Sequence, residues 1–331
     1  VTRIDADSSS VMTESGLVLP YDACLVAAGS QRTTFGIEGA DVHAVGLRLV
    51  DDAVRIARRL DKLAARKRRA SIVIVGGGVS GVEALGEILR RRAQGDEFNI
   101  HVVEREPRIL EQQPQRLASD AAMRFAPFPV TLHTDAAVSR VEARSVTLAS
   151  GEKLTADLCI WSAGMTLPGF LRDAGLNDAG DEWLPVDETL RSLYADNIFI
   201  AGDCAALPKP VRKQAYHAMA MGEVAGDNIS RLLRDRPLRR FRPAPMPMLI
   251  SFGDLTTWLV AGEYAVASPL LAAAKEGVYQ ATMARLASPK DPLRYSADVF
   301  DRATMATRQL LLPQLTARKL IDGLTGSRII I

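Results

Sequence analysis

The stretch 70–104 most constrains the fold of this chain, because it places a glycine-rich turn between a strand and a helix. It reads ASIVIVGGGVSGVEALGEILRRRAQGDEFNIHVVE. The apolar, β-branched run Ser71–Val75 predicts a buried parallel strand. Val79–Arg92 predicts a helix, and Asn99–Val103 predicts the next strand. This order is typical of a β-α-β unit of the Rossmann type.

The glycines of this unit form the pattern G-x-G-x-x-G. Gly76 permits the tight turn after the strand, and Gly78 lets the backbone approach a pyrophosphate. Gly81 lets the helix pack against the strand, with the helix N-terminus facing the phosphates. Glu104 ends the second strand, where a carboxylate accepts hydrogen bonds from an adenosine ribose and repels a 2′-phosphate. An ordinary glycine-rich turn is the alternative, but the order of the four elements favours dinucleotide binding, with NADH preferred over NADPH.

Composition narrows the class of protein. A chain of 331 residues that is 47% hydrophobic and 24% charged should form two or three domains. A formal net charge of +2 gives no indication of a nucleic-acid partner. The cysteines Cys24, Cys159 and Cys204 lie far apart and form no C-x-x-C pair. This spacing is typical of a protein in the reducing cytoplasm and argues against a dithiol mechanism.

The first 30 residues suggest that this domain does not begin here. VTRID and VMTES predict two strands, and LVLPYDACLVAAGS predicts a buried strand that runs into Ala28-Gly29-Ser30. Such a meander is an unusual opening for an independent domain. We therefore expect 1–35 to be the end of a nucleotide-binding segment whose first β-α-β unit lies upstream. The chain also begins on valine rather than methionine, which is consistent with a fragment or a misplaced start.

The segment after Glu104 continues the dinucleotide-binding unit. A second helix is predicted over Arg116–Ala126, followed by short strands. The predicted strands are Val130–His133, Ala137–Glu142, Ser145–Leu148 and Leu158–Trp161. Another small-residue turn, Ser162-Ala163-Gly164, then closes the segment. Because turns of this kind stand on both sides of the unit, we expect one domain to be inserted into another.

A family resemblance rests on four motifs. Asn197–Ala205 reads NIFIAGDCA, and a helix is predicted over about 212–234. EWLPVDETLRS precedes this motif, and YDACLVAAG and DLCIWSAG occur earlier in the chain. With the glycine-rich unit, these motifs resemble the pyridine-nucleotide-dependent FAD oxidoreductases over residues 1–233. Within that superfamily the chain most resembles type II NADH dehydrogenases, which are NADH:quinone oxidoreductases.

The resemblance implies an α/β fold with tandem Rossmann-like FAD- and NAD(P)-binding domains, the NAD domain inserted in the FAD domain. It also implies a C-terminal α+β interface region. The expected ranges are 1–35 and 163–240 for the two FAD segments, 36–162 for the NAD(H)-binding domain and 241–331 for the interface domain. The implied cofactors are FAD and NADH, and no metal is expected.

The resemblance also assigns residues to the site. Gly202 and Asp203 are expected to bind the ribityl chain of FAD. Lys213 and Gln214 are expected to lie at the N1–C2 edge of the flavin ring. There the N-terminus of the following helix would stabilise the anionic reduced flavin. Glu83 and Glu87 are expected near the junction of nicotinamide and flavin, although a solvated helix face explains them equally well. The remaining expected cofactor contacts are Ala28, Gly29, Ala163 and Gly164.

Several departures from the family pattern leave alternatives open. Only the second of the family's two G-x-G-x-x-G fingerprints is present, so FAD would lack its pyrophosphate cradle unless the natural protein is longer. Cys159 and Cys204 are expected to be buried packing residues rather than a redox pair. Gln214-Ala215-Tyr216 matches the quinone-reducing relatives only loosely, and His217 is expected to be a surface or packed residue rather than an acid–base group.

The residues from Leu238 onward have a different composition. Strands are predicted over Leu249–Phe252 and Thr256–Ala261, and helices over Leu270–Leu286 and Asp298–Leu311. Glu263 and Pro269 argue against a membrane span over the weakly charged segment 255–274. Leu315–Leu324 and the preceding leucines allow two interpretations, a helix in a membrane interface or one docked on the chain's own core or on a second copy, and the second is favoured.

We expect a cytoplasmic enzyme that passes a hydride from NADH to FAD and then electrons to an acceptor, with a quinone favoured. Peripheral attachment to the inner face of the cell membrane and a homodimer both remain open. One alternative is a reductase of the ferredoxin or rubredoxin type, which requires an iron–sulfur partner. The other is a truncated, non-catalytic NADH-binding protein.

Overall fold

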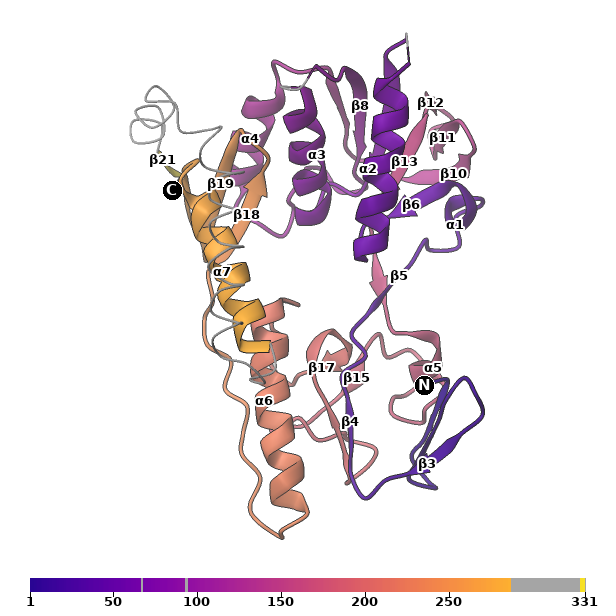
Figure 1. Cartoon of the computed structure of the whole chain (residues 1–331), viewed down its shortest axis with the longest axis vertical. Coiled ribbons are helices and arrows are strands. Elements are labelled where there is room, and N and C mark those ends of the chain that lie inside the picture. Colours follow the sequence, from indigo (N-terminus) through magenta and orange to yellow (C-terminus); the bar gives the residue numbers. More distant parts are fainter. Residues whose placement is uncertain (67, 93–94, 287–327, 331) are drawn as a thin grey trace. The chain divides into compact units, whose positions relative to one another are not determined.

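A computed structural model describes residues 1–66, 68–92, 95–286 and 328–330 (Figure 1). The chain divides into two compact units. Unit 1 contains Val1–Thr33 and Gly164–Met246, and unit 2 contains Thr34–Ala163 and Pro247–Ile331. Each unit is therefore built from two separate pieces of sequence. The assignment of the four expected ranges to cofactor domains remains a prediction.

Unit 2 is built around a five-stranded sheet with the order β6-β13-β7-β8-β9, in which every neighbouring pair is parallel. The strands are β6 (Ala44–Gly46), β7 (Ala70–Val75), β8 (Phe98–Val103), β9 (Val130–His133) and β13 (Leu158–Trp161). From β7 the chain continues to β8 and β9 on one side, and then returns to β13 on the other side. The strand order thus reverses between β7 and β13, and ligands of open α/β sheets bind outside the carboxyl ends at such a point.

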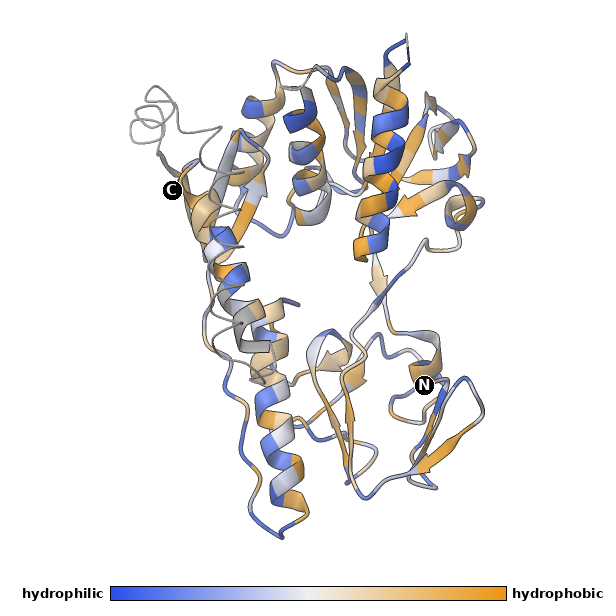
Figure 2. Cartoon of the chain, viewed as in Figure 1, coloured by the Kyte–Doolittle hydropathy of each residue, from blue (hydrophilic) through white to orange (hydrophobic). Residues whose placement is uncertain are grey.

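Both faces of this sheet are covered, which explains why β7 is apolar along its whole length. The helices are α1 (Ala40–His43), α2 (Val50–Ala64), α3 (Val79–Arg92) and α4 (Gln115–Phe125). Ile72 and Ile74 share one core with the apolar residues of α2, α3 and α4, while Val73 and Val75 pack on the opposite side with Ala40 of α1. A three-stranded antiparallel meander comprises β10 (Val138–Glu142), β11 (Ser145–Leu148) and β12 (Lys153–Thr155). Figure 2 shows hydrophobic and hydrophilic residues alternating along α2 and α3, as expected for helices with one buried side.

The C-terminal part of unit 2 contains a four-stranded antiparallel sheet and a helix. In the sequence, the helix lies between the third and the fourth strand. Its elements are β18 (Met248–Phe252), β19 (Thr256–Ala261), β20 (Tyr264–Ala267), α7 (Leu271–Leu286) and β21 (Arg328–Ile330). The sheet packs on α3, and Ile250, Phe252 and Trp258 belong to the same core as the parallel sheet. At the closest approach, a Cβ on Gly86 would lie 2.5 Å from the amide nitrogen of Gly253. Glycine at these two positions therefore allows helix and sheet to touch.

The weakly charged segment 255–274 forms β19, β20 and the start of α7. Across 1–66, 68–92, 95–286 and 328–330, no helix combines the length and the apolar character needed to cross a bilayer. The helices predicted over 298–311 and 315–324 lie outside the described residues.

Unit 1 consists of short strands and one long helix. Its elements are the meander β1 (Arg3–Asp5), β2 (Ser10–Met12) and β3 (Val18–Pro20), the parallel pair β4 (Cys24–Val26) and β16 (Ile198–Ile200), the antiparallel pair β5 (Gln31–Arg32) and β14 (Met165–Thr166), the parallel pair β15 (Leu184–Pro185) and β17 (Ala205–Ala206), the short helix α5 (Gly169–Arg172), the 3₁₀ turn η1 (Gly202–Cys204) and the helix α6 (Ala215–Leu232). The α/β class predicted from the sequence is confirmed.

The structure corrects some predicted boundaries. The stretch 17–30 contains two strands rather than one, because Pro20 ends β3 and β4 then pairs with β16. Helix α2 ends at Ala64, and beyond its end Arg66 and Arg68 pair with the carboxylate of Asp157.

The prediction that Cys159 and Cys204 are buried packing residues rather than a redox pair is confirmed. Cys159 and Cys204 are both buried, and neither they nor Cys24 form a disulfide. Burial raises the pKa of the Cys204 thiol, so it stays protonated at neutral pH.

Candidate functional site

The turn after β7 can only be formed by glycine at two of its positions. Gly76 has a φ of 102°, and a Cβ there would lie 2.9 Å from the amide nitrogen of Ala163. A Cβ on Gly81 would lie 1.9 Å from the carbonyl oxygen of Gly76. Gly77, which the sequence analysis did not single out, is also confined, since a Cβ there would lie 2.7 Å from Cγ2 of Ile109. The N-terminus of α3 thus packs directly on the turn.

Gly78 differs from its neighbours, because no atom lies within 4 Å of the position that its Cβ would take. It directly precedes Val79, the first residue of the 14-residue helix α3. An open space beside free backbone N–H groups at a helix N-terminus suits a phosphate. The residues present therefore fit the pyrophosphate of a dinucleotide.

Glu104 lies at the carboxyl end of β8, the strand next to β7, and its side chain is anchored at the rim of this turn. Oε2 accepts a hydrogen bond from the Gly77 N–H (2.6 Å), and Oε1 accepts one from the Glu106 N–H (2.9 Å). The Glu104 N–H itself donates to the carbonyl of His133 (2.8 Å). A carboxylate can accept about four hydrogen bonds. Two of its acceptor positions therefore remain for hydroxyl groups of a ligand.

The end of β13 lies against the same turn. The hydroxyl of Ser162 donates to the carbonyls of Val75 (2.9 Å) and Gly76 (3.0 Å). The indole N–H of Trp161 donates to the carbonyl of Ala163 (2.8 Å), so this turn is rigidly connected to the strand. Gly164, the next residue, has a φ of 74°. Ser162 was not among the predicted site residues, although it holds the glycine turn from the switch-point side.

Glu83 and Glu87 both have protein partners on or beside α3. Glu83 Oε1 accepts a hydrogen bond from the Ser251 N–H (3.0 Å) and forms an ion pair with Lys275. Glu87 is more than half exposed and pairs with Arg90 at 2.9 Å. In this arrangement Glu83 connects α3 to β18 and α7. The expected catalytic role of the two glutamates remains a prediction.

A second group of candidate residues gathers at the carboxyl ends of β4 and β16 in unit 1. These strands are parallel and adjacent, so the Ala28-Gly29-Ser30 turn and the Gly202-Asp203 turn lie at one edge. The hydroxyl of Ser30 donates to Oδ2 of Asp203 (3.0 Å). Gly29 and Gly202 have φ values of 67° and 80°, in the region that favours glycine. The predicted contacts Ala28, Gly29, Gly202 and Asp203 are therefore brought together.

The start of α6 adds a cation and an amide to this edge. The Lys213 ammonium donates to the backbone carbonyl of Asp203 and lies 3.6 Å from the centroid of the Trp183 ring. Burial lowers the pKa of Lys213, and the charge of Asp203 acts in the opposite direction. Gln214 is the N-cap residue of α6, and its buried Oε1 accepts no hydrogen bond from any described residue. A buried acceptor without a donor indicates a place for a ligand.

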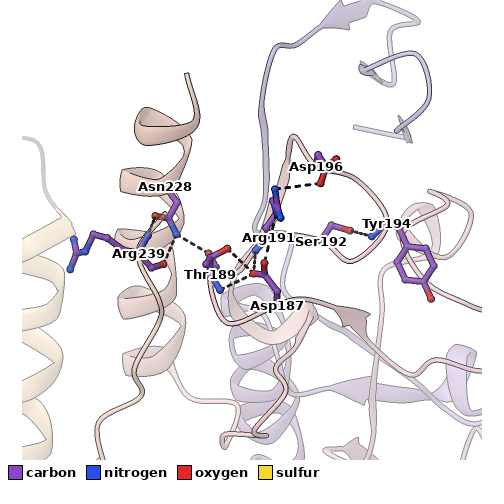
Figure 3. A network of polar contacts seen from close by, with 8 residues as sticks. All are labelled: Asp187, Thr189, Arg191, Ser192, Tyr194, Asp196, Asn228 and Arg239. Carbon is purple, nitrogen blue, oxygen red and sulfur yellow. Dashed lines mark hydrogen bonds and ion pairs between the residues drawn. The ribbon is translucent and has the colours of Figure 1, made fainter. Parts of the chain in front are cut away.

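Polar contacts connect α6 to the loop that precedes this edge (Figure 3). Asn228, which is fully buried, donates from Nδ2 to the carbonyls of Thr189 and Arg239, at 2.8 Å each. Its Oδ1 accepts from the Arg239 N–H (2.7 Å). Asp187 accepts from the backbone N–H groups of Thr189 (2.7 Å) and Arg191 (3.1 Å). His217, also on α6, is buried and hydrogen-bonded to the carbonyls of two loops.

Comparisons with known proteins identify a matching family and similar sequences. A family model described as pyridine nucleotide-disulphide oxidoreductase matches residues 1–222. The chain is 30% identical over 274 residues to an NADH dehydrogenase-like protein of Mycobacterium tuberculosis, with 77% of this chain and 66% of that protein covered. It is 28% identical over 278 residues to a type II NADH:quinone oxidoreductase of Staphylococcus aureus, with coverages of 77% and 69%. The match thus spans just under two thirds of the mycobacterial relative.

Among solved structures, the fold is similar to that of NDH2 from Plasmodium falciparum in complex with NADH. The TM-score is 0.71 at 16% sequence identity, covering 93% of this chain and 82% of that one. A sulfide:quinone oxidoreductase from Aquifex aeolicus matches with a TM-score of 0.67 at 18% identity, over 81% of this chain and 66% of that one. At these identities the likeness establishes the α/β fold.

Proposed function

Because the chain belongs to the pyridine nucleotide-disulphide oxidoreductase family, we propose that it is an FAD-dependent NADH oxidoreductase whose final acceptor is a quinone. The observation that carries the proposal is the cradle in unit 2, with open space at Gly78 and the fixed carboxylate of Glu104 at its rim. The acceptor is suggested by relatives that are named NADH:quinone oxidoreductases.

In the proposal, residues 36–162 hold NADH. The N–H groups at the start of α3 bind the pyrophosphate, because they have no partners within the helix and lie at its positive end. The free acceptor positions of Glu104 bind the ribose hydroxyls. The same negative charge would repel a 2′-phosphate, so NADH is preferred to NADPH.

The segments 1–35 and 163–240 hold FAD in the proposal, and 241–331 form the interface region. A bound flavin supplies the hydride-accepting chemistry. Asp203, oriented by Ser30, would accept hydrogen bonds from the ribityl hydroxyls. Lys213 and Gln214 would face the pyrimidine edge, where a cation and the N-terminus of α6 favour negative charge.

The test is the visible absorption spectrum of the purified protein before and after anaerobic addition of NADH. A bound flavin that bleaches with NADH, but more weakly with NADPH, supports the proposal. Two variants separate the halves of the site. Asp203→Ala should lower flavin content and leave NADH binding intact, whereas Glu104→Ala should weaken NADH binding and leave flavin content intact.

A protein without flavin, in the longest product of its reading frame, would contradict the proposal. So would NADH affinity that is unchanged in Glu104→Ala. The acceptor is tested separately by comparing turnover with a water-soluble quinone and with a ferredoxin. Turnover with the ferredoxin alone would replace the quinone in the proposal by an iron–sulfur protein.

A further inference from the structure

The Lys213 ammonium is held by two uncharged groups, the backbone carbonyl of Asp203 and the face of the Trp183 indole. The carboxylates of Asp203 and Glu182 attract the cation as well, but a carboxylate in direct contact would cancel most of its field. A carbonyl dipole and an aromatic face stabilise the ammonium while leaving its net charge in place.

Strand pairing fixes the position of the indole. Trp183 directly precedes β15, and Leu184 of that strand pairs with Ala205 of β17. Ala205 in turn follows the turn Gly202–Cys204. The backbone therefore holds Trp183 beside the turn whose Asp203 carbonyl binds the ammonium. A lysine side chain has four rotatable bonds, and these two contacts restrict it to one place.

We propose that Trp183 is a positioning residue, which holds the Lys213 ammonium at the Gly202–Asp203 turn so that its charge stabilises the anionic reduced flavin. This inference rests on the proposed function, since it needs a flavin at that edge. In this inference Trp183 does not touch the reacting atoms itself and acts through Lys213. It also gives a reason for an aromatic residue at a part-exposed position next to a two-residue strand.

The first test needs no flavin and asks whether the two side chains are coupled. Tryptophan emission is followed between about pH 7 and pH 11. The other two tryptophans, Trp161 and Trp258, are buried in unit 2 and supply a constant background. Burial shifts the pKa of Lys213 downward, while Asp203, Cys204 and Glu182 attract the cation and oppose the shift. We therefore expect an emission change with a midpoint below the ordinary lysine value of about 10.4.

Two lysine variants make this test specific. Lys213→Met should abolish the emission change, and Trp183→Phe should remove the signal. Lys209→Met is the matched control, because Lys209 is an exposed cation on the same loop and should leave the titration unchanged. Tyrosine ionisation at high pH is common to all variants and cancels in the difference. An emission change that persists in Lys213→Met would overturn the coupling.

The second test measures the midpoint potential of the bound flavin. Trp183→Leu, which has no aromatic face, should weaken binding of the reduced flavin about tenfold relative to the oxidised flavin. For a two-electron couple this is a fall of about 30 mV. Trp183→Phe should retain most of the wild-type potential, and Lys209→Met should match the wild type. Equal potentials in Trp183→Leu and Trp183→Phe would overturn the inference.

The two tests also separate this inference from the proposed function. If the protein binds no flavin, the proposed function fails and the role of Trp183 toward flavin fails with it. If flavin binds and is reduced by NADH but its potential does not respond to position 183, only the inference fails.

Discussion

The two candidate half-sites are built in different ways. In unit 2 the cradle lies within the continuous stretch from Gly76 to Glu104, and backbone atoms in contact define its shape. In unit 1 the edge around Asp203 combines Ser30, Trp183 and Lys213, which are far apart in the sequence and are joined by side-chain contacts. A motif of the first kind can be recognised in a sequence, whereas one of the second kind requires the fold.

The largest effect is expected from Gly81→Ala in the backbone-built cradle. The new Cβ would lie 1.9 Å from the Gly76 carbonyl, and neither backbone can move without displacing α3 from β7. We expect a loss of about 3 kcal/mol in the free energy of unfolding of unit 2, together with loss of NADH binding. Urea denaturation, with hydrogen exchange used to resolve the two units, measures the loss of stability of unit 2.

Gly226→Ala is the control for this substitution, since no atom lies within 4 Å of the Cβ position on that exposed part of α6. It should stabilise unit 1 by about 0.5–1 kcal/mol through helix propensity. If the two substitutions had equal effects, backbone contact would not be what distinguishes the cradle.

Asn228→Ala tests the polar construction of unit 1. Three hydrogen bonds of a fully buried side chain are lost, and the carbonyls of Thr189 and Arg239 lose this donor. We expect a loss of about 2 kcal/mol in the free energy of unfolding of unit 1, with reduced flavin content. Asn177→Ala is the control, because the Asn177 amide donates a long hydrogen bond of 3.4 Å to the carbonyl of the adjacent Asp178. If Asn228→Ala lowered hydrogen-exchange protection only in unit 2, this would contradict the contrast between the units.

Gly78→Ala should separate ligand binding from folding within the cradle. The Cβ enters open space, so the free energy of unfolding should stay within about 0.5 kcal/mol of the wild type. The methyl group would instead occupy the space proposed for the pyrophosphate and reduce NADH affinity about tenfold, or about 1.4 kcal/mol. Calorimetric titration with NADH measures the change. Unchanged affinity would argue against a pyrophosphate at Gly78.

The smallest effect concerns two histidines beside the cradle. His101 on β8 and His133 on β9 share a hydrogen bond of 3.1 Å between Nδ1 and Nε2. Burial, followed by the charge of His133, lowers the pKa of His101, and Glu152 acts in the opposite direction. The unfolded chain therefore takes up a proton before the folded chain does.

It follows that the free energy of unfolding of unit 2 should decrease as the pH falls below about 6.5, the unperturbed histidine value. The decrease should end at the lowered pKa of folded His101. His101→Gln should make the urea midpoint less dependent on pH over this window. The corresponding change in the free energy of unfolding should be smaller than the change caused by Asn228→Ala. A wild-type midpoint that rises on acidification would contradict the assigned direction of the pKa shift.

Much of the fold could be predicted where the signal is local. The bounds of α3 agree with the prediction, and the strands on both sides of it are present. The strands β12 and β17 were not predicted, because strands of two or three residues show no periodicity. Lys275 and Ser251 were missed for the same reason, since their contact with Glu83 depends on how β18 and α7 pack on α3.

The sequence by itself determined that β-branched strands, a glycine turn and a terminal carboxylate follow one another, because each of these depends on residues close together in the chain. Only the tertiary structure decided which side chains surround Asp203. It also decided that Glu83 binds Lys275, and that Glu104 is anchored by the N–H of Gly77. The physical reason is that parallel strand pairing and helix packing bring together residues far apart in sequence, and no local preference of the chain encodes those partners.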